Sequence, residues 1–514
     1  MPVKRWISIS KQIVAHRIDP LSVWSKLQIQ QPAYLLETVT GFDRTAQYSC
    51  LGFAPLFRLQ GKGHRLEITD LRPGRAGERQ ILQGPLLESL RFVLNQLGPS
   101  LTPHLPPLAE AMVGYLTYDI IRQWENLPNQ PDDDLQWPDC DFLIPGKVIC
   151  FDHRRGFINC GAFDYLGGLS ELLDSSQGTR IGEENQDVTS ITREEQVRER
   201  LRQELDTLVG SLQKCRTEDL QDQVRLAIHT QPLSRNAGIE LVSNVDRKTF
   251  ESSVMRAQQY IYQGDIFQVV LSQRWRCSLP SDPLDLYRAL RVLNPSPHMF
   301  YLDWGSRQLV GSSPERLVRV EGRWASTRPI AGTRPRGGSP QEDEQLANSL
   351  LGDPKERAEH VMLVDLGRND LGKVSRFGSV EVSRFMQIEH FSHVMHLVSD
   401  VQGLLRDGFD AFDALKACFP AGTLTGAPKV RAMEIIDELE TVKRGPYGGV
   451  VGYFSLQGDM ETCITIRSIA CQDGLAYIQA GAGIVADSVP EREFRETENK
   501  ARALVRALEV SQAY

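Results

Sequence analysis

The pattern of hydrophobic and polar positions divides the chain into three regions. In the first, residues 1–173, short apolar runs alternate with turn residues, as in YLLETVTGF and YSCLGFAPLFRL, which predicts strands joined by tight turns. One helix is expected over LLESLRFVLNQL. Residues 174–244 are polar and charged, and REEQVRERLRQELDTLVGSLQKC spaces Leu and Val as in an amphipathic connecting helix. In residues 245–510, a helix capped near Asp246 and ended by Gly264 precedes a Val-rich strand.

Neither a repeat nor a regular alternation of strand and helix is visible, which favours an α+β fold. The net charge of −8 argues against a nucleic-acid binder, which normally carries a basic face. The N-terminus has no apolar signal segment, and no run approaches the roughly 20 apolar residues of a membrane span. Nine cysteines are scattered without metal-binding spacing. We therefore expect unrelated thiols in a cytoplasmic protein.

Two segments carry acidic pairs at helical spacing. In DPKERAEHVMLVDLG, Glu356 and Glu359 are three residues apart and share one helix face. In VPEREFRETENKA, Pro490 suits a helix start, and Glu493, Glu496 and Lys500 fall on one face. Either pair alone is typical of a solvated face. Together, two such helices could hold one Mg²⁺, which prefers oxygen ligands.

The run YIQAGAGIVADS ends a predicted strand on Gly481, Ala482 and Gly483. It imitates a dinucleotide fingerprint, but that turn requires a helix directly after the glycines, and here the strand continues until Pro490. A glycine strand that lets backbone N–H groups approach a carboxylate is favoured, with close strand packing as the alternative.

Two further segments could contribute polar groups. The loop FPAGTLTGAPK, which contains Thr423, precedes a strongly helical run and could present hydroxyl and N–H groups to an anion. In EHFSHVMHLVSD, the histidines at 390, 393 and 396 lie on a predicted strand, so successive ones point to opposite faces and a zinc cluster is disfavoured. His396 alone remains a candidate proton donor.

In order, these segments resemble the chorismate-utilising enzymes, and most closely component I of anthranilate synthase. The matching runs include GDIFQVVLSQR, NPSPHMFYL, GSSPERL, RPIAGTRPRG, RGPYGGVVGYF and TCITIRS in addition to those above, and they cover about residues 247–506. The resemblance implies a large intertwined β-sandwich flanked by helices, with residues 245–510 binding chorismate.

The resemblance also implies roles for individual residues. Glu359, Glu496 and Glu493 would bind Mg²⁺, with Glu356 beside them. His396 would assist loss of the C4 hydroxyl, next to Thr423. Chorismate would be held by a substrate-binding set: Gly332, Thr333, Tyr447, Arg467, Gly481, Ala482, Gly483 and Lys500.

Two positions distinguish the activities of this family. Related 4-amino-4-deoxychorismate synthases commonly carry a lysine nucleophile where this chain has Ala331, and isochorismate and salicylate synthases carry a water-activating lysine where it has Gln268. Alanine cannot attack and a neutral amide cannot serve as a base. The resemblance therefore implies direct amination at C2 with ammonia to give anthranilate, the first step of tryptophan biosynthesis. The aminodeoxychorismate activity and a non-catalytic chorismate- or tryptophan-binding regulator are the alternatives.

The chain contains no amidotransferase signature, so a separate glutamine amidotransferase subunit is expected to supply ammonia. The first half resembles the tryptophan feedback region of the family. The residues expected at that regulatory site are Glu37, Thr38, Pro297, His298 and Met299. Thr38 and His298 depart from the serine and tyrosine usual in the family, which leaves the strength of inhibition by tryptophan open.

Overall fold

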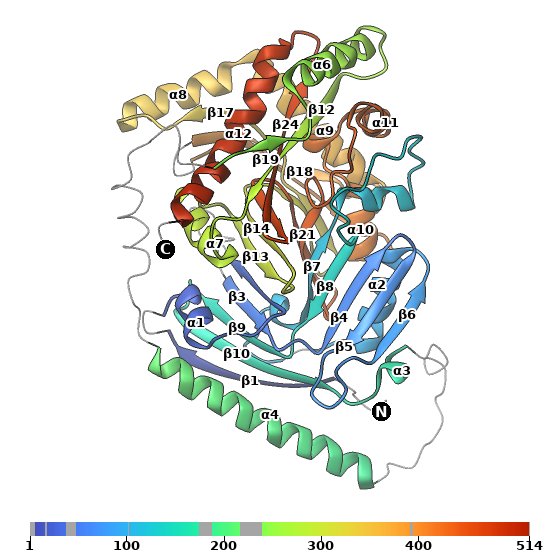
Figure 1. The fold of residues 1–514 in the computed structure, drawn as a ribbon, viewed down its shortest axis with the longest axis vertical. Helices are drawn as coiled ribbons and strands as arrows, with labels where there is room; N and C mark the ends of the chain where they lie inside the picture. Colours follow the sequence, from blue (N-terminus) through green and yellow to red (C-terminus); the bar gives the residue numbers. More distant parts are fainter. Residues whose placement is uncertain are drawn as a thin grey trace.

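The structure, a computed structural model, describes residues 6–15, 18–37, 48–100, 102–173, 188–215, 239–390 and 394–512, with only the backbone of 188–192. These residues form two antiparallel sheets of twelve strands each, with helices packed around them (Figure 1). The expected α+β fold is confirmed.

The first sheet joins strands from both ends of the sequence. Its strand order is β1-β10-β9-β3-β2-β13-β14-β23-β24-β12-β11, with β20 pairing on β12. Its strands are β1 (Trp6–Val14), β2 (Ala33–Glu37), β3 (Tyr48–Phe53), β9 (Lys147–Asp152), β10 (Phe157–Tyr165), β11 (Val242–Ser243), β12 (Gln268–Ser278), β13 (His298–Asp303), β14 (Arg307–Ser313), β20 (Gly426–Ala427), β23 (Ser468–Gln472) and β24 (Leu475–Ile484).

The second sheet is built in the same way. Its order is β17-β19-β16-β15-β22-β21-β7-β8-β4-β5-β6, with β18 pairing on β19. Its strands are β4 (Phe57–Lys62), β5 (Arg65–Asp70), β6 (Arg79–Gln83), β7 (Ala111–Leu116), β8 (Cys140–Ile144), β15 (Arg316–Glu321), β16 (Trp324–Thr327), β17 (Ile330–Pro335), β18 (Glu381–His390), β19 (Val394–Leu404), β21 (Val450–Ser455) and β22 (Met460–Ile464).

In both sheets the early strands pair directly with late ones: β2 with β13, where Glu37 lies opposite Met299, and β7 with β21, where Val113 lies opposite Tyr453. The described residues of the first third therefore share their cores with residues from the rest of the chain. Tyr34 and Phe300 of the first sheet and Tyr115 of the second are buried in one apolar cluster between the sheets. Removing such aromatic surface from water is the main force that holds the two sheets together.

Helices cover the outer faces. They are α1 (Pro20–Lys26), α2 (Leu86–Leu97), α3 (Leu169–Leu172), α4 (Val188–Lys214), α6 (Arg247–Tyr262), α7 (Pro283–Leu293), α8 (Pro340–Gly352), α9 (Pro354–Gly372), α10 (Ala411–Cys418), α11 (Lys429–Leu439) and α12 (Pro490–Ser511), with short 3-10 turns η1 (Pro107–Glu110), η2 (Tyr118–Gln123) and η4 (Gly422–Leu424). The helices expected from sequence at α2, α4 and α6 are present, and Asp246 caps α6 through its side chain.

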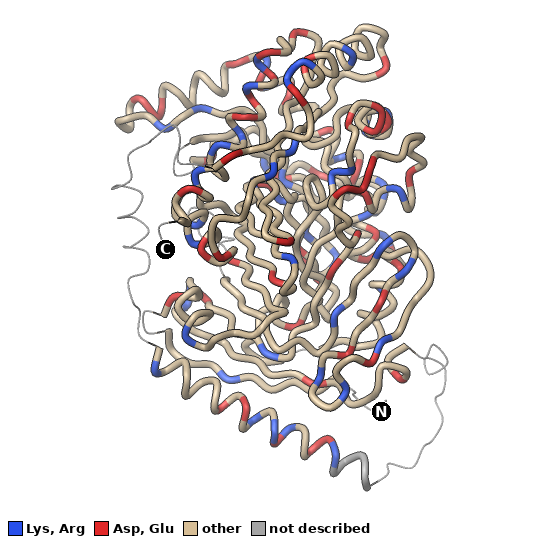
Figure 2. The backbone as a smooth tube through the Cα atoms, viewed as in Figure 1, with Lys and Arg blue, Asp and Glu red and all other residues tan. Residues whose placement is uncertain are grey.

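The connecting helix α4 lies along the outer side of β1 and β10, with acidic and basic residues alternating along it (Figures 1 and 2). Leu201, Leu205 and Leu212 are buried against the first sheet. Its charged face carries ion pairs such as Lys11–Asp206, at 2.7 Å. No helix within the described residues is both long and apolar enough to cross a membrane.

The cysteines differ from expectation at one place. Cys50 of β3 and Cys150 of β9 lie directly opposite each other and form a disulfide. The expectation of nine unrelated thiols was therefore wrong for this pair, because the sequence does not reveal which strands become neighbours. The other seven cysteines are free and buried.

Candidate active site

A cavity of about 820 Å³ opens between the two sheets and the helices α9 and α12. Strands β12, β17, β19 and β24 and the loop before α11 supply the remaining walls. Most of the residues singled out from sequence line it: Gln268, Ala331, Gly332, Thr333, Glu359, His396, Thr423, Tyr447, Arg467, Gly481, Gly483, Glu493, Glu496 and Lys500. Residues spread over more than 200 positions of sequence thus converge on one site.

Two predicted residues do not line this cavity. Ala482 is fully buried in an apolar cluster with Phe250 and Ile436, because alternate side chains of a strand point to opposite faces. The carboxylate of Glu356 pairs with Arg334 at 3.0 Å. Its Oε2 atom nevertheless lies 3.1 Å from the position that a Cβ on Gly332 would take, so it sits directly behind the cavity wall.

Helix α9 supplies the first acidic group. Asp353 caps the helix by accepting hydrogen bonds from the backbone N–H groups of Lys355 and Glu356, and Pro354 occupies the first turn. This fixed start directs Glu359 into the cavity, where its carboxylate makes no hydrogen bond or ion pair with any described residue. Burial, and then the nearby charge of Glu356, raise the pKa of Glu359.

Helix α12 supplies the second acidic group. It begins at Pro490, as expected, and its first turns place Glu493 and Glu496 on the cavity. Burial, and to a smaller extent the charge of Glu496, raise the pKa of Glu493. Lys500 pairs with Glu496 at 2.8 Å and donates to the carbonyl of Gly481 at 2.9 Å, so it ties the helix to β24.

The chemistry of these acids suits a hard divalent cation. Carboxylate oxygens from two helices face one cavity. Burial and a neighbouring negative charge destabilise the ionised forms of Glu359 and Glu493, and a bound cation would offset this destabilisation. Within the described residues, however, no three His, Cys, Asp or Glu side chains lie close enough together to surround an ion. Binding would therefore require the acids to be drawn together, with Lys500 releasing Glu496.

His396 lies across the cavity on β19. Its Nδ1 atom is 2.8 Å from the carbonyl oxygen of Gly332 and 3.1 Å from Oγ1 of Thr333. Because a carbonyl only accepts, Nδ1 carries the hydrogen, and Nε2 is the acceptor atom of the neutral ring. Burial lowers the pKa of His396, and the charge of Arg467 lowers it further. Of the other two histidines, His390 is exposed and position 393 lies outside the described residues.

Arg467 is the cation of the inner cavity. It has a φ of 51°, a left-handed conformation that side chains other than glycine rarely adopt. Its guanidinium makes no hydrogen bond or ion pair with the part of the chain that the structure describes. Burial lowers its pKa, against the opposing effect of Glu315. A strained, desolvated cation facing a cavity is suited to bind an anion.

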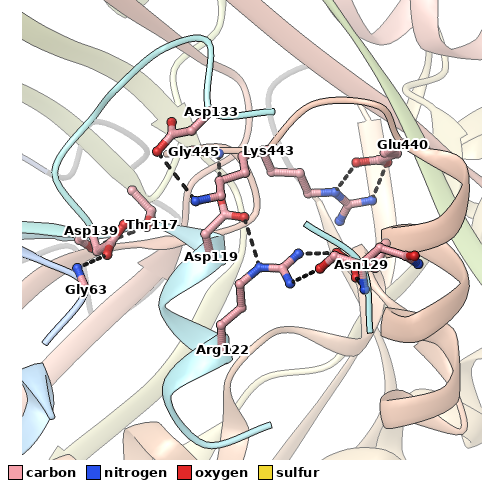
Figure 3. A network of polar contacts seen from close by, with 12 residues as sticks. Gly63, Thr117, Asp119, Arg122, Asn129, Asp133, Asp139, Glu440, Lys443 and Gly445 are labelled. Carbon is pink, nitrogen blue, oxygen red and sulfur yellow. Dashed lines mark hydrogen bonds and ion pairs between the residues drawn. The ribbon is translucent and has the colours of Figure 1, made fainter. Parts of the chain in front are cut away.

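A network of polar contacts fixes the segment that leads to Tyr447 (Figure 3). Asp119 of η2 accepts a hydrogen bond from the N–H of Gly445 at 2.9 Å, and Arg122 pairs with Asp437. Burial raises the pKa of Asp119 to about 6. The early segment around η2 thus holds in place a late loop of the cavity wall.

Arg444 is the centre of this wall. It is buried, pairs with Glu440 at 2.7 Å, and donates to the carbonyls of Leu424 and Val270 at 2.7 and 2.8 Å. Its guanidinium also lies 5.7 Å from the ring centre of Tyr447. One side chain therefore joins the loop beside Thr423, strand β12 and Tyr447.

The absence of a side chain at Gly481 allows the hydroxyl of Tyr447 to lie close to strand β24. A Cβ there would lie 2.9 Å from both the Tyr447 hydroxyl and the carbonyl oxygen of Leu271. We expect Gly481→Ala to displace Tyr447 and raise the KM for the cavity's ligand by about tenfold, corresponding to an overpacking cost of about 1–3 kcal/mol. Steady-state kinetics would measure this. Gly210→Ala in α4, where a Cβ meets nothing within 4 Å, should leave KM unchanged.

Comparison with known proteins agrees with this geometry. A family model described as chorismate binding enzyme matches residues 14–506. The chain belongs to the chorismate binding enzyme family. It is 44% identical over 503 residues to anthranilate synthase component 1 of Acetivibrio thermocellus, covering 98% of this chain and 95% of that protein. The corresponding protein of Synechocystis sp. is 42% identical over 518 residues, with 98% and 96% covered.

Solved structures of chorismate binding enzymes extend the comparison. Anthranilate synthase component I from Streptococcus pneumoniae TIGR4 superimposes with a TM-score of 0.70 at 33% identity, covering 96% of this chain and 99% of that one. The menaquinone-specific isochorismate synthase of Escherichia coli has a TM-score of 0.66 at 19% identity, covering 98% and 94%, and so shares the fold. The resemblance stated from sequence is confirmed.

Sequence reasoning did not single out Glu315, which this chorismate binding enzyme places in the cavity. Glu315, in the run GSSPERL, lines the cavity and accepts a hydrogen bond from Oγ1 of Thr423 at 3.0 Å. Burial raises its pKa, while Thr423 acts in the opposite direction. The signal was present, because an acid in the short link between two buried strands, β14 and β15, requires a partner or a function.

The residues expected to bind tryptophan lie apart from the cavity, on the paired strands β2 and β13. Glu37 is buried, accepts from the Tyr287 hydroxyl at 2.6 Å and pairs with Arg291 at 2.7 Å. Met299 is buried opposite it, and burial lowers the pKa of His298 to about 4. Pro297 is partly buried directly before β13, and Thr38 lies outside the described residues.

Proposed function

We propose that this chain is the large subunit of an anthranilate synthase, which converts chorismate and ammonia to anthranilate, pyruvate and water. The observation that carries the proposal is that one cavity holds both the largely buried Arg467, whose guanidinium has no hydrogen-bond or ion-pair partner among the described residues, and carboxylates from α9 and α12. The full-length similarity to proteins named anthranilate synthase component 1 supports it.

The residues present account for the binding of a dicarboxylate. Arg467 and the Tyr447 hydroxyl would hold one carboxylate of chorismate, with backbone N–H groups near Gly481 and Gly483. Glu359, Glu493 and Glu496 would hold Mg²⁺, which supplies Lewis-acid neutralisation of the ring carboxylate when bound. Gly332 and Thr333 would lie against the ring, where a side chain on Gly332 would collide with Leu350.

The reaction is balanced in two steps. Ammonia forms a bond to C2 as the C4–O bond breaks, the departing hydroxyl takes a proton and leaves as water, and the new ammonium group releases one proton. The bond between ring C3 and the enolpyruvyl oxygen then breaks as the hydrogen at C2 leaves as a proton, and the enolpyruvate takes up a proton and leaves as pyruvate, with aromatisation to anthranilate. His396 would give the proton to the leaving hydroxyl, and Thr423 would lie beside the substrate, since both residues line the cavity.

Two residues of the cavity wall support ammonia as the nucleophile. Ala331 is buried at the position where a lysine would attack, and offers no such group. Gln268 lines the cavity with a neutral amide, which lies 2.6 Å from the position of a Cβ on Gly483. Neither side chain can act as a nucleophile or as a base, so ammonia attacks directly.

Ammonia would come from a separate glutamine amidotransferase subunit, since this chain carries no residues recognisable for that chemistry. Tryptophan would inhibit from the region around Glu37 and Met299. That site would act on the cavity through α7, which packs against α12.

A direct assay tests this function. The purified chain is mixed with chorismate, Mg²⁺ and an ammonium salt at mildly alkaline pH, where free ammonia is available. We expect fluorescent anthranilate and an equal amount of pyruvate. Absence of both would remove the proposal, and accumulation of a non-aromatic 4-amino compound would assign the chain to aminodeoxychorismate synthesis.

The dependence of kcat/KM on pH should show the titration of His396. Because burial lowers its pKa below the ordinary 6.5, His396 is neutral in the free enzyme at pH 7 and must be protonated to act as an acid. With rates expressed per free ammonia, kcat/KM should therefore fall as pH rises through an apparent pKa below 6.5. His396→Asn should lose this limb of the profile. An unchanged profile in that variant would exclude His396 as the proton donor.

A further inference from the structure

One buried group on the cavity wall lacks the partner that its chemistry requires. Gln479 lies on β24, two residues before Gly481 and therefore on the same face of the strand. Its side chain lines the cavity and is 8% exposed, yet its Oε1 atom has no hydrogen-bond partner among the described residues. An unpaired buried acceptor is costly to retain, so it points to a missing donor.

The orientation of this amide is fixed by its neighbours. The carboxylate of Glu440, which pairs with Arg444, can only accept hydrogen bonds. It accepts one from the Ser272 hydroxyl, with 2.8 Å between the two oxygen atoms. The Ser272 oxygen is then left to accept, and it does so from Nε2 of Gln479 at 2.9 Å. The NH₂ end of the amide is therefore held by Ser272, and its carbonyl oxygen is the free end.

A neighbouring glutamine shows the contrast. Gln273 is fully buried in the adjacent strand β12, and both ends of its amide are satisfied. Its Nε2 donates to Thr497 at 2.7 Å, and its Oε1 accepts from Ser243 at 3.1 Å. The sheet can thus satisfy a buried glutamine completely. At Gln479, a residue of the cavity wall, the acceptor is buried and has no partner within the described part of the chain.

We propose that the Oε1 atom of Gln479 is the acceptor that positions ammonia for attack on the bound substrate, an inference that rests on the proposed function. Ammonia brings N–H donors and must keep its lone pair free. A neutral amide oxygen accepts one N–H without favouring ammonium, whereas a carboxylate would hold the protonated and unreactive form. The relay from Arg444 through Glu440 and Ser272 keeps this oxygen in place.

Gln479→Met tests the inference because it keeps the length of the side chain and removes the acceptor. With ammonium chloride as the nitrogen source, the KM for ammonia should rise about fivefold to tenfold, the effect of one hydrogen bond, while the KM for chorismate stays within about twofold. Gln273→Met is the matched control and should change neither constant. Ser272→Ala, which releases the amide without altering Gln479, should raise the ammonia KM in the same direction.

The outcomes separate the two proposals. If the unsubstituted chain forms no anthranilate, the proposed function fails and this inference falls with it. If it is active but the ammonia KM is unchanged in both Gln479→Met and Ser272→Ala, the oxygen binds only structural water and the inference alone is overturned. A rise in the chorismate KM instead would assign the acceptor to the substrate hydroxyl and would also overturn it. Melting temperatures of each variant identify any loss of folding.

Discussion

Replacing Glu359 by Gln should abolish Mg²⁺-dependent turnover without weakening the fold. The amide keeps the shape of the side chain but removes a charged oxygen ligand, and the loss of several kcal/mol of Lewis-acid stabilisation corresponds to about a 10³-fold fall in kcat/KM. Because the pKa of Glu359 is raised in the folded chain, its ionised form destabilises the fold as pH rises above the ordinary value. At pH 7.5 the variant should therefore melt at the same or a higher temperature.

A second measurement makes this test independent of activity. Mg²⁺ should raise the melting temperature of the unsubstituted chain by binding only the folded state, and this rise should disappear in Glu359→Gln. The control is Asp365→Asn on the same helix, where an exposed carboxylate pairs with Arg368 at 2.7 Å. It should leave both turnover and the Mg²⁺ effect unchanged. Normal turnover in Glu359→Gln would show that this glutamate is not a metal ligand.

Sequence patterns located the local elements of the site well. The proline at 490 predicted the start of α12, and the start of α9 depends on an equally local signal, the capping side chain of Asp353. Helical spacing was less informative about side-chain direction. Glu356 and Glu359 are three residues apart, which is 60° short of a full turn, and only Glu359 faces the cavity while Glu356 turns to Arg334.

What escaped prediction depends on neighbours distant in sequence. The pairing of β7 with β21 and the disulfide between Cys50 and Cys150 both follow from strand order, which periodicity does not encode. The same holds for Glu315, whose partner Thr423 is more than 100 residues away. Gln479 could have been recognised earlier, because it shares the strand face of Gly481.

Replacing Arg467 should weaken the binding of chorismate without weakening the fold. Arg467→Asn removes the cation that faces the cavity, and truncation of one partner of a desolvated charge pair costs about 2–5 kcal/mol. We therefore expect kcat/KM for chorismate to fall by about 10²–10³-fold, mainly through KM. Asn tolerates the left-handed conformation that Arg467 adopts at φ 51°.

The thermal stability of Arg467→Asn should stay the same or rise, although its activity falls. The pKa of Arg467 is lowered by burial, which means that the folded state disfavours its charge, and the left-handed conformation adds strain. Arg467→Asn should therefore melt at the same or a higher temperature while losing substrate affinity. The matched control is Asp473→Asn in the turn after β23, the strand that begins directly after Arg467. Asp473 has a φ of 52°, is exposed and is not among the residues that line the cavity. It should keep full activity. A fall in melting temperature together with an unchanged KM in Arg467→Asn would show that Arg467 is a structural residue. The anion site would then have to lie elsewhere. A binding residue held in a strained conformation is retained for its ligand and not for the fold, so its replacement should not destabilise the protein.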